Sequence, residues 1–264
     1  SYALGILFRD HPDEVYAVRK DSPLIVGTSK SGNLIASDVP AVLKYSRDVY
    51  FLENEEIVKL TRDGLHFYNI DEEELEKEAT HIDWDMNAAE KGGYEHFMLK
   101  EIYDQPRCMA DCMRGRLLLN EKRIVLSTIN MHRERLMKAE RFIIVACGTS
   151  WHAGLIGKQL IEQWANIPVE VEYASEFRYR NPVISPDDVV IAISQSGETA
   201  DTLAAFQLAK ENKAMCFGIV NVVGSSIARA SDTGIYIHVG PEIGVASTLS
   251  LIHISEPTRR SYIS

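Results

Sequence analysis

The sequence predicts an α/β protein, in which short antiparallel strands precede a doubly wound parallel sheet. Residues 2–70 contain short apolar runs joined by turn dipeptides such as Asp-Gly and Ser-Gly, a pattern typical of antiparallel strands. After residue 141, fully apolar runs alternate with helical stretches of about a dozen residues, which is typical of βαβ units with a sheet covered on both faces. The segment between these two parts is acidic at first and then helical.

Short strands are expected throughout the first part of the chain. They lie at residues 4–8, 14–18, 24–27, 33–36, 50–52, 57–60 and 65–70, and their spacing predicts an antiparallel meander. Residues 71–90 are acidic and weakly periodic, so we expect a solvated connector. Residues 91–117 predict a helix that is interrupted at Pro106, because proline lacks the N–H that a helix interior uses.

The second part of the chain predicts a parallel sheet with its ligand at one edge. Strands are expected at residues 142–146, 169–173, 189–193, 215–220 and 235–239, and helices at 151–164 and 200–212, with a further short helix after the "NVVGSS" segment. In open sheets of this kind, ligands bind outside the carboxyl ends of the strands. The loops that follow the strands are therefore the candidate ligand sites.

Two of these loops are rich in hydroxyl groups and contain neither lysine nor arginine. "CGTS" follows residues 142–146, "SQSGET" follows residues 189–193, and each opens a helix. Helix starts present unpaired N–H groups that bind anions, and the serine and threonine side chains add further donors. Serine and threonine are also ordinary N-cap residues, but two such loops on one sheet favour a site for a phosphate group. No G-x-G-x-x-G or P-loop motif occurs, which leaves a phosphorylated small molecule such as a sugar phosphate.

Composition excludes several other classes of function. The formal charge of −10 over 264 residues argues against a nucleic-acid partner. The longest apolar runs, such as residues 142–147, are far too short to span a bilayer, and no signal peptide opens the chain, so we expect a cytoplasmic protein without a membrane partner. The four cysteines, Cys108, Cys112, Cys147 and Cys216, are too few and too irregularly spaced for a disulfide framework or a zinc site, and no metal is expected.

Several motifs together resemble one enzyme family. They are "ACGTS" (146–150), "ASEFRYR" (174–180), "SQSGETADTL" (194–203), "GSS" (224–226) and "EIGVAST" (242–248). This combination is similar to the first sugar isomerase (SIS) domain of the isomerizing glutamine:fructose-6-phosphate aminotransferases, whereas "SQSGET" alone is typical of the wider SIS superfamily. The segment "KGGYEHFMLKEIYDQP" resembles the interdomain segment of that family, and residues 1–70 resemble the carboxyl part of its glutaminase domain, which has an Ntn-hydrolase-like fold.

The resemblance implies a reaction and a set of binding residues. The amide nitrogen of glutamine would be transferred to fructose 6-phosphate, giving glucosamine 6-phosphate and glutamate, without a metal or redox cofactor. The phosphate would be held by Ser150, Ser194, Gln195, Ser196 and Thr199, and the sugar by Thr149, Val245 and Ser247 above a floor formed by Cys147 and Gly148. The intact enzyme is expected to be a homodimer or higher oligomer.

The resemblance also implies a fragment with four parts. These are part of the glutaminase domain (1–75), a linker with helices (76–117), the first SIS domain (118–248), and residues 249–264. The last part resembles a translated sequencing adapter, so His253 and Glu256 are expected to carry no function. Ser1 follows the family's missing catalytic N-terminus, and no catalytic role is expected for it.

No catalytic residue is expected within the chain, because the resemblance places the acid and base groups in absent segments. Glu198 is expected to pack at a helix start, Glu242 to support a loop, and His152 to occupy a first helical turn. The alternative function is a sugar-phosphate sensor, in which a SIS domain binds a ligand and controls a partner. The strands of residues 1–70 and the "KGGYEHFMLKEIYDQP" segment favour the enzyme.

Overall fold

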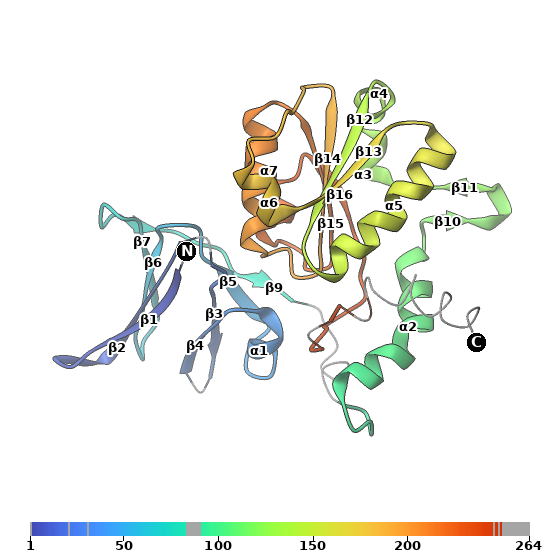
Figure 1. Cartoon of the computed structure of the whole chain (residues 1–264). Helices are drawn as coiled ribbons and strands as arrows, with labels where there is room; N and C mark the ends of the chain where they lie inside the picture. Colours follow the sequence, from blue (N-terminus) through green and yellow to red (C-terminus); the bar gives the residue numbers. More distant parts are fainter. Residues whose placement is uncertain are drawn as a thin grey trace. The chain divides into compact units, whose positions relative to one another are not determined.

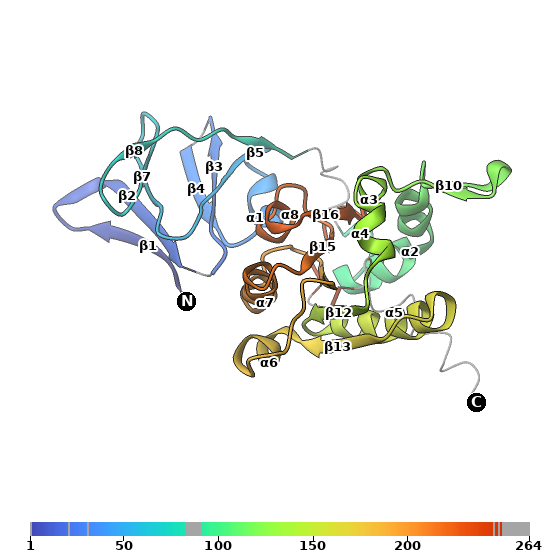
Figure 2. The same ribbon diagram turned by 90° about the horizontal axis from the view of Figure 1, so that it is seen from above.

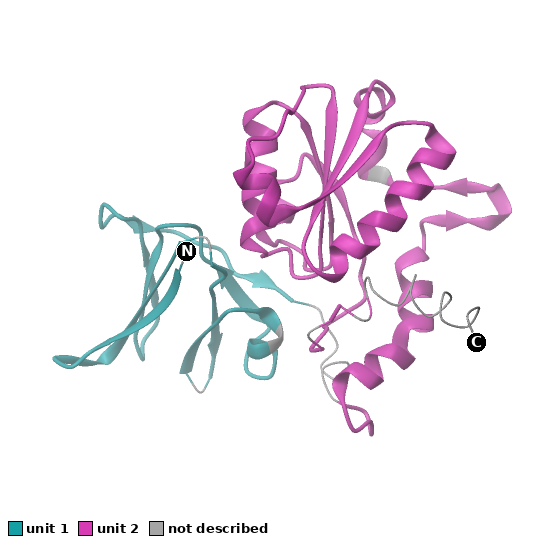
Figure 3. Ribbon diagram, viewed as in Figure 1, with its two compact units in different colours: residues 1–89 teal, residues 90–264 magenta. Residues whose placement is uncertain are grey.

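A computed structural model describes residues 2–20, 22–30, 32–82, 91–244, 246–247 and 249 of the chain. The chain divides into two compact units, residues 1–89 and 90–264 (Figure 3), and each is considered by itself. The four-part division predicted above stays a prediction. Among the described helices, none combines the length and the apolar composition that a membrane crossing requires.

Unit 1 consists of antiparallel strands and one short helix. Its elements are β1 (Tyr2–Phe8), β2 (His11–Lys20), β3 (Ile25–Ser29), β4 (Gly32–Ala36), α1 (Val39–Leu43), β5 (Asp48–Phe51), β6 (Ile57–Leu60), β7 (Leu65–Tyr68), β8 (Glu74–Leu75) and β9 (Thr80–His81). The strands form two sheets, with the orders β1-β2-β6-β7-β8 and β4-β3-β5-β9 (Figure 1). Ala17, Val58 and Phe67 of the first sheet share an apolar core with Val26 of the second.

The prediction of antiparallel strands in unit 1 is confirmed, but the prediction that they form a single meander is wrong. β2 pairs directly with β6, with Val15 opposite Leu60, although the strands β3, β4 and β5 of the other sheet lie between them in the sequence. The predicted connector also contains β8 and β9, whose partners are β7 and β5. These two-residue strands form because neighbouring strands supply their hydrogen bonds, and the local sequence carries no sign of it.

Unit 2 contains a five-stranded parallel sheet between two layers of helices. In chain order its elements are α2 (Phe97–Met113), β10 (Leu117–Leu118), the 3₁₀ turn η2 (Leu119–Glu121), β11 (Arg123–Ile124), α3 (Ser127–Asn130), α4 (Arg133–Met137), β12 (Arg141–Ala146), α5 (Thr149–Ala165), β13 (Val169–Tyr173), α6 (Ala174–Tyr179), β14 (Asp188–Ser194), α7 (Ala200–Glu211), β15 (Met215–Val220), α8 (Ser226–Ala230) and β16 (Thr233–Tyr236). The strand order is β13-β12-β14-β15-β16. The doubly wound parallel sheet predicted from the sequence is confirmed.

Successive side chains of β12 point to opposite faces of this sheet and contribute to the apolar core on each face. Ile143 and Val145 pack with Phe206 of α7, whereas Ile144 packs on the opposite face with partly buried side chains of α5 such as Trp151. Figure 2 shows α6, α7 and α8 on one side of the sheet and α3, α4 and α5 on the other. Burying one such aliphatic side chain contributes about 1.5–3 kcal/mol, and covering both faces explains why the strands are apolar throughout.

Helix α2 continues through Pro106, so the predicted interruption is wrong. The helix spans Phe97–Met113, with Pro106 inside it. A proline removes one backbone hydrogen bond, and the remaining bonds and the packing of the helix outweigh that loss. Cys108, two residues further on, is buried against Val239 and Leu249.

The outer edge of β16 is covered by side chains from the segment that precedes the sheet. The Thr128 hydroxyl donates to the Gly234 carbonyl at 2.8 Å, and the Arg116 guanidinium donates to the Tyr236 carbonyl. The strand ends at Tyr236, earlier than the predicted 239, because the chain turns away there. His238 and Gly240 have φ values of 53° and 82°, which no strand residue adopts.

Candidate functional site

The strand order places the two hydroxyl-rich loops on neighbouring strands. β12 and β14 lie side by side, with Ala146 opposite Ile193. The chain leaves β12 into α5 on one face of the sheet and leaves β14 into α7 on the other. This makes the β12/β14 boundary the switch point of the sheet, where open α/β sheets bind their ligands. The loops 147–150 and 195–199 flank that point, as the sequence predicts.

The first loop turns into α5 through Gly148. This residue is the N-cap of the helix, with φ 56° and ψ −129°, a conformation that favours glycine strongly. Its carbonyl accepts the N–H groups of Trp151 and His152 at 3.1 and 3.4 Å. The first N–H groups of a helix have no partner within it, so the start of α5 offers anion donors beside the predicted Ser150, whose side chain is largely buried.

The second loop is shaped by its own hydroxyl groups. The Ser194 Oγ accepts the N–H of Gly197 at 3.0 Å and lies 3.2 Å from the Thr199 Oγ1, while the Ser196 Oγ accepts the N–H of Glu198 at 3.1 Å. A hydroxyl that accepts in this way still has its own hydrogen to donate. The Ser194 hydroxyl, on a residue only 3% exposed, holds the turn and keeps that hydrogen, and Gln195, Ser196 and Thr199 are half-buried.

Glu198 joins this loop to the start of α8. Its carboxylate accepts the N–H and the hydroxyl of Ser226, both at 2.7 Å, and the Gly197 carbonyl accepts the N–H of Ile227 at 2.9 Å. An acidic group at a helix N-terminus is stabilising. Glu198 thus has the packing role that the sequence predicts, although the helix is α8 and not α7.

Ser225 is a neighbour of the loop that the sequence reasoning missed. The residue is fully buried, and its hydroxyl has no hydrogen-bond partner among the described residues. A Cβ atom at Gly197 would lie 2.0 Å from that hydroxyl oxygen. Gly197 therefore has two reasons to be glycine, a φ of 69° and the close approach of Ser225. Only the "GSS" motif pointed to this region.

Of the remaining predicted residues, Cys147 and Thr149 lie at the same edge of the sheet, after β12 and at the start of α5. Cys147 is half-buried, with its Sγ 3.9 Å from the Thr202 Oγ1 of α7. Ser247 lies in the segment that follows β16, and the described residues show no hydrogen bond from it to either loop. Val245 lies outside the described residues. Glu242 accepts the N–H of Leu249 at 2.7 Å, in keeping with its predicted role in loop structure.

Asn221 ties the end of β15 to the segment after β16. Its amide donates to the Gly240 carbonyl at 2.6 Å, its side-chain oxygen accepts the N–H of Val239 at 3.0 Å, and its own N–H donates to the Gln195 carbonyl at 3.2 Å. One residue thereby connects the second loop with the segment that leads to Ser247. No local pattern points to this residue, because its partners lie up to 26 positions away.

The four cysteines differ in their burial. All four cysteines are free. Burial raises the pKa of Cys216 to about 12 and also raises the pKa of Cys108. No cluster of metal-ligating side chains occurs in the described part of the chain, and His152 is an exposed residue of the first turn of α5.

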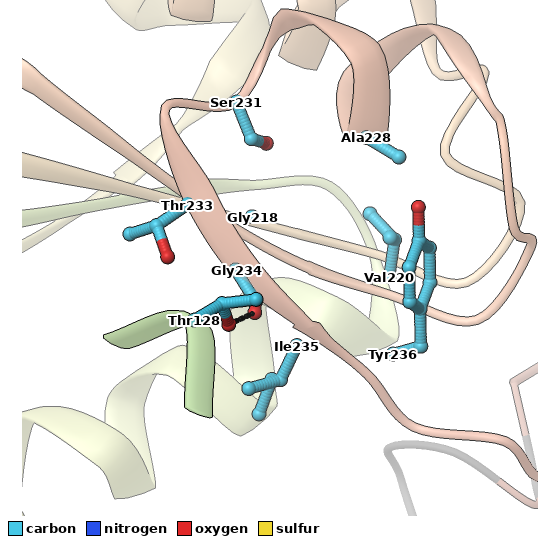
Figure 4. Close-up of a pocket in the computed structure, with 9 residues that line it drawn as sticks. All are labelled: Thr128, Gly218, Val220, Ala228, Ser231, Thr233, Gly234, Ile235 and Tyr236. Atoms are coloured by element: carbon cyan, nitrogen blue, oxygen red, sulfur yellow. Dashed lines mark hydrogen bonds between the residues drawn. The ribbon is translucent and has the colours of Figure 1, made fainter. Parts of the chain in front are cut away.

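A separate cavity lies along β16. It has a volume of about 160 Å³ and is lined by Thr128, Gly218, Val220, Ala228, Ser231, Thr233, Gly234, Ile235 and Tyr236. Figure 4 shows the Tyr236 ring beside Val220 and Ala228, and Thr128 bonded to Gly234. The cavity shares no residue with the predicted site.

Comparisons with known proteins show which proteins this chain is similar to. The family model described as "SIS domain" matches residues 135–255. The chain is 56% identical over 248 residues to a glutamine--fructose-6-phosphate aminotransferase [isomerizing] of Clostridium acetobutylicum, and 56% identical over 249 residues to one of Bacteroides thetaiotaomicron. Each alignment covers 94% of this chain and 41% of the relative, so the chain spans about two fifths of the length of the curated relatives it matches.

A solved structure supports the fold of unit 2. The C-terminal domain of glucosamine-fructose-6-phosphate aminotransferase from Francisella tularensis is 42% identical and has a TM-score of 0.56. The match covers 61% of this chain and 44% of that one.

Proposed function

We propose a function from the premise that this chain carries a SIS domain and is a sequence relative of the isomerizing glutamine–fructose-6-phosphate aminotransferases: unit 2 binds the phosphate and sugar of fructose 6-phosphate. The observation that carries the proposal is the position of two polar loops on either side of the β12/β14 switch point. As part of a whole protein, the chain would serve the transfer of the glutamine amide nitrogen to that sugar. The products would be glucosamine 6-phosphate and glutamate.

The binding mode follows from the donors at the switch point. The phosphate dianion would accept hydrogen bonds from Ser150, Ser194, Gln195, Ser196 and Thr199 and from the N–H groups at the starts of α5 and α7, and Ser194 would also hold the turn. Hydrogen bonds to charged groups contribute about 1.5–3 kcal/mol each, so four of them would be enough to bind a phosphate group without a lysine. Neutral donors also leave no fixed positive charge to retain the product.

The sugar would lie over Cys147 and Gly148 and beside Thr149, Val245 and Ser247. This part of the proposal rests on the resemblance of "ACGTS" and "EIGVAST" to the family. Proton transfer between sugar carbons needs a positioned acid or base, and we place those groups outside this chain, with no metal or redox cofactor. Unit 1 would belong to the glutaminase part, and a cytoplasmic homo-oligomer remains part of the proposal.

Binding of fructose 6-phosphate to the chain tests the proposal directly. Isothermal titration calorimetry should show saturable binding, which Thr199→Ala and Ser196→Ala each weaken by about tenfold or more, because each removes a donor to a charged group. Ser231→Ala is the matched control. It also deletes a serine hydroxyl in unit 2, one that donates to the Ile227 carbonyl, and should leave binding unchanged. Absence of binding by the folded wild-type chain, or equal weakening by all three variants, would refute the proposal.

A further inference from the structure

Glu101 reaches from helix α2 to a segment more than 140 residues away. Its Oε1 accepts the N–H groups of Ile243 and Gly244, at 2.7 and 2.9 Å. The residue is only 3% exposed, and a buried carboxylate is stable only where hydrogen bonds replace its hydration. The proposed binding mode assigns it no role.

The contact between Glu101 and this segment leaves no spare room. A Cβ atom at Gly244 would lie 2.5 Å from the Glu101 Oε2 and 3.3 Å from its Cδ. One carboxylate oxygen therefore lies beside the position that a side chain at residue 244 would take, while the other accepts the two N–H groups. The absence of a side chain at position 244 is what allows this approach.

A second contact holds the same two parts of the chain together. Two helical turns beyond, the Cys108 thiol donates to the Val239 carbonyl at 3.5 Å, and Cys108 forms an apolar cluster with Ile237, Val239 and Leu249. Figure 1 shows the segment after β16 running beside α2. The carboxylate thus fixes the middle of a segment whose two ends are already packed on α2.

We infer that Glu101 is a positioning residue for the sugar side of the site, an inference that rests on the proposed function. Ser247, a proposed sugar contact, follows the anchored pair by only three residues. The second phosphate loop has contacts of its own, of Ser194 with Gly197 and of Glu198 with Ser226. Its link to the segment through Asn221 is made at Val239 and Gly240, which precede the anchored pair. Loss of the anchor should therefore weaken recognition of the sugar and leave recognition of the phosphate intact.

The test compares two probes on the full chain, fructose 6-phosphate and inorganic phosphate. Glu101→Ala should weaken binding of the sugar phosphate by about tenfold, equivalent to about 1.4 kcal/mol, and change phosphate binding by less than about twofold. Glu101→Gln should have a smaller effect, because one amide oxygen can accept both N–H groups. Glu121→Ala, which removes an exposed carboxylate from the same unit, is the control and should change neither affinity.

A substitution on the other side of the contact gives an independent measurement. Gly244→Ala should separate the segment from Glu101 and reproduce the selective loss, and the double variant with Glu101→Ala should lose little more than either single variant. Amide hydrogen exchange at Ile243 and Gly244 should be faster in Glu101→Ala without any ligand, with thermal unfolding recorded to confirm the fold.

A failure of the positioning role can be distinguished from a failure of the proposed function. Unchanged sugar-phosphate binding in Glu101→Ala, or an equal loss for both probes, would overturn the positioning role. If the wild-type chain binds neither probe, the proposed function fails and the sugar role of Glu101 fails with it. Faster exchange in the variant would in that case still establish the anchor as a structural one.

Discussion

Replacement of Gly197 by alanine should destabilise unit 2 for two separable reasons. The backbone at Gly197 has a φ of 69°, and an L-residue in the left-handed region costs about 1–2 kcal/mol. The new Cβ would also lie 2.0 Å from the Ser225 Oγ and 2.5 Å from its Cβ. Ser225 is fully buried and cannot move into solvent, so we add the usual cost of overpacking, about 1–3 kcal/mol. The sum is roughly 2–5 kcal/mol.

Gly115→Ala separates the two contributions. Gly115 has a φ of 72° in the same unit, and no atom lies within 4 Å of the position that its Cβ would take, so its replacement should cost only the backbone part, about 1–2 kcal/mol. Ser225→Gly combined with Gly197→Ala should recover the steric part, because it removes both clashing atoms.

The assay is urea unfolding followed by the fluorescence of Trp151 and Trp164, in a Trp84→Phe background so that both reporters lie in unit 2. Destabilisation is read as a lower midpoint at constant slope. If Gly197→Ala costs no more than Gly115→Ala, or if Ser225→Gly rescues nothing, the close approach of Ser225 does not constrain this loop and the reasoning is wrong.

Two further predictions concern the ion pairs and the thiols. Arg141→Ala should destabilise unit 2 by about 2–3 kcal/mol, because it leaves the buried Asp188 without the guanidinium that contacts it at 3.0 and 2.6 Å; this is below the cost for a fully buried pair, since the arginine is partly exposed. Arg180→Ala, which breaks an exposed pair with Glu172, should cost at most about 1 kcal/mol in the same urea assay. Equal costs of the two substitutions would contradict the argument from burial. In iodoacetamide labelling at about pH 8 mapped by mass spectrometry, Cys112 and Cys147 should react, while Cys108 and Cys216 stay unmodified until the chain unfolds. Burial raises the pKa of Cys108 and raises that of Cys216 to about 12, and only the thiolate reacts. Labelling of native Cys216 at the rate of Cys112 would contradict this prediction.

The sequence predicted most strands closely but could not predict which strands pair. β6 and β15 lie at the residues expected, 57–60 and 215–220, because their apolar runs are bounded by turn residues. The pairing of β2 with β6 joins residues as far apart in the sequence as Val15 and Leu60, so a local pattern could not distinguish two sheets from one meander. The prediction that the helix is interrupted at Pro106 was wrong for a similar reason, because a rule about one residue takes no account of the packing of the whole helix α2.

The candidate site was predictable where it depends on strand ends. The two loops were located from the apolar runs before them, and parallel order brought them to one edge. Asn221, Ser225 and Glu101 were not, because each acts through partners 18 to 143 positions away. A single sequence shows what a residue can donate or accept, but not what folding places beside it.

The two side-chain bonds on β16 block one edge of the sheet. A further strand, whether from this chain or from another copy, would need the Gly234 and Tyr236 carbonyls as acceptors, and Thr128 and Arg116 already occupy them. Exposed strand edges are the ordinary route by which sheets recruit each other and aggregate. At β16 one hydroxyl and one guanidinium close that route, so an assembly of copies on this flank would use side-chain surfaces instead of backbone pairing.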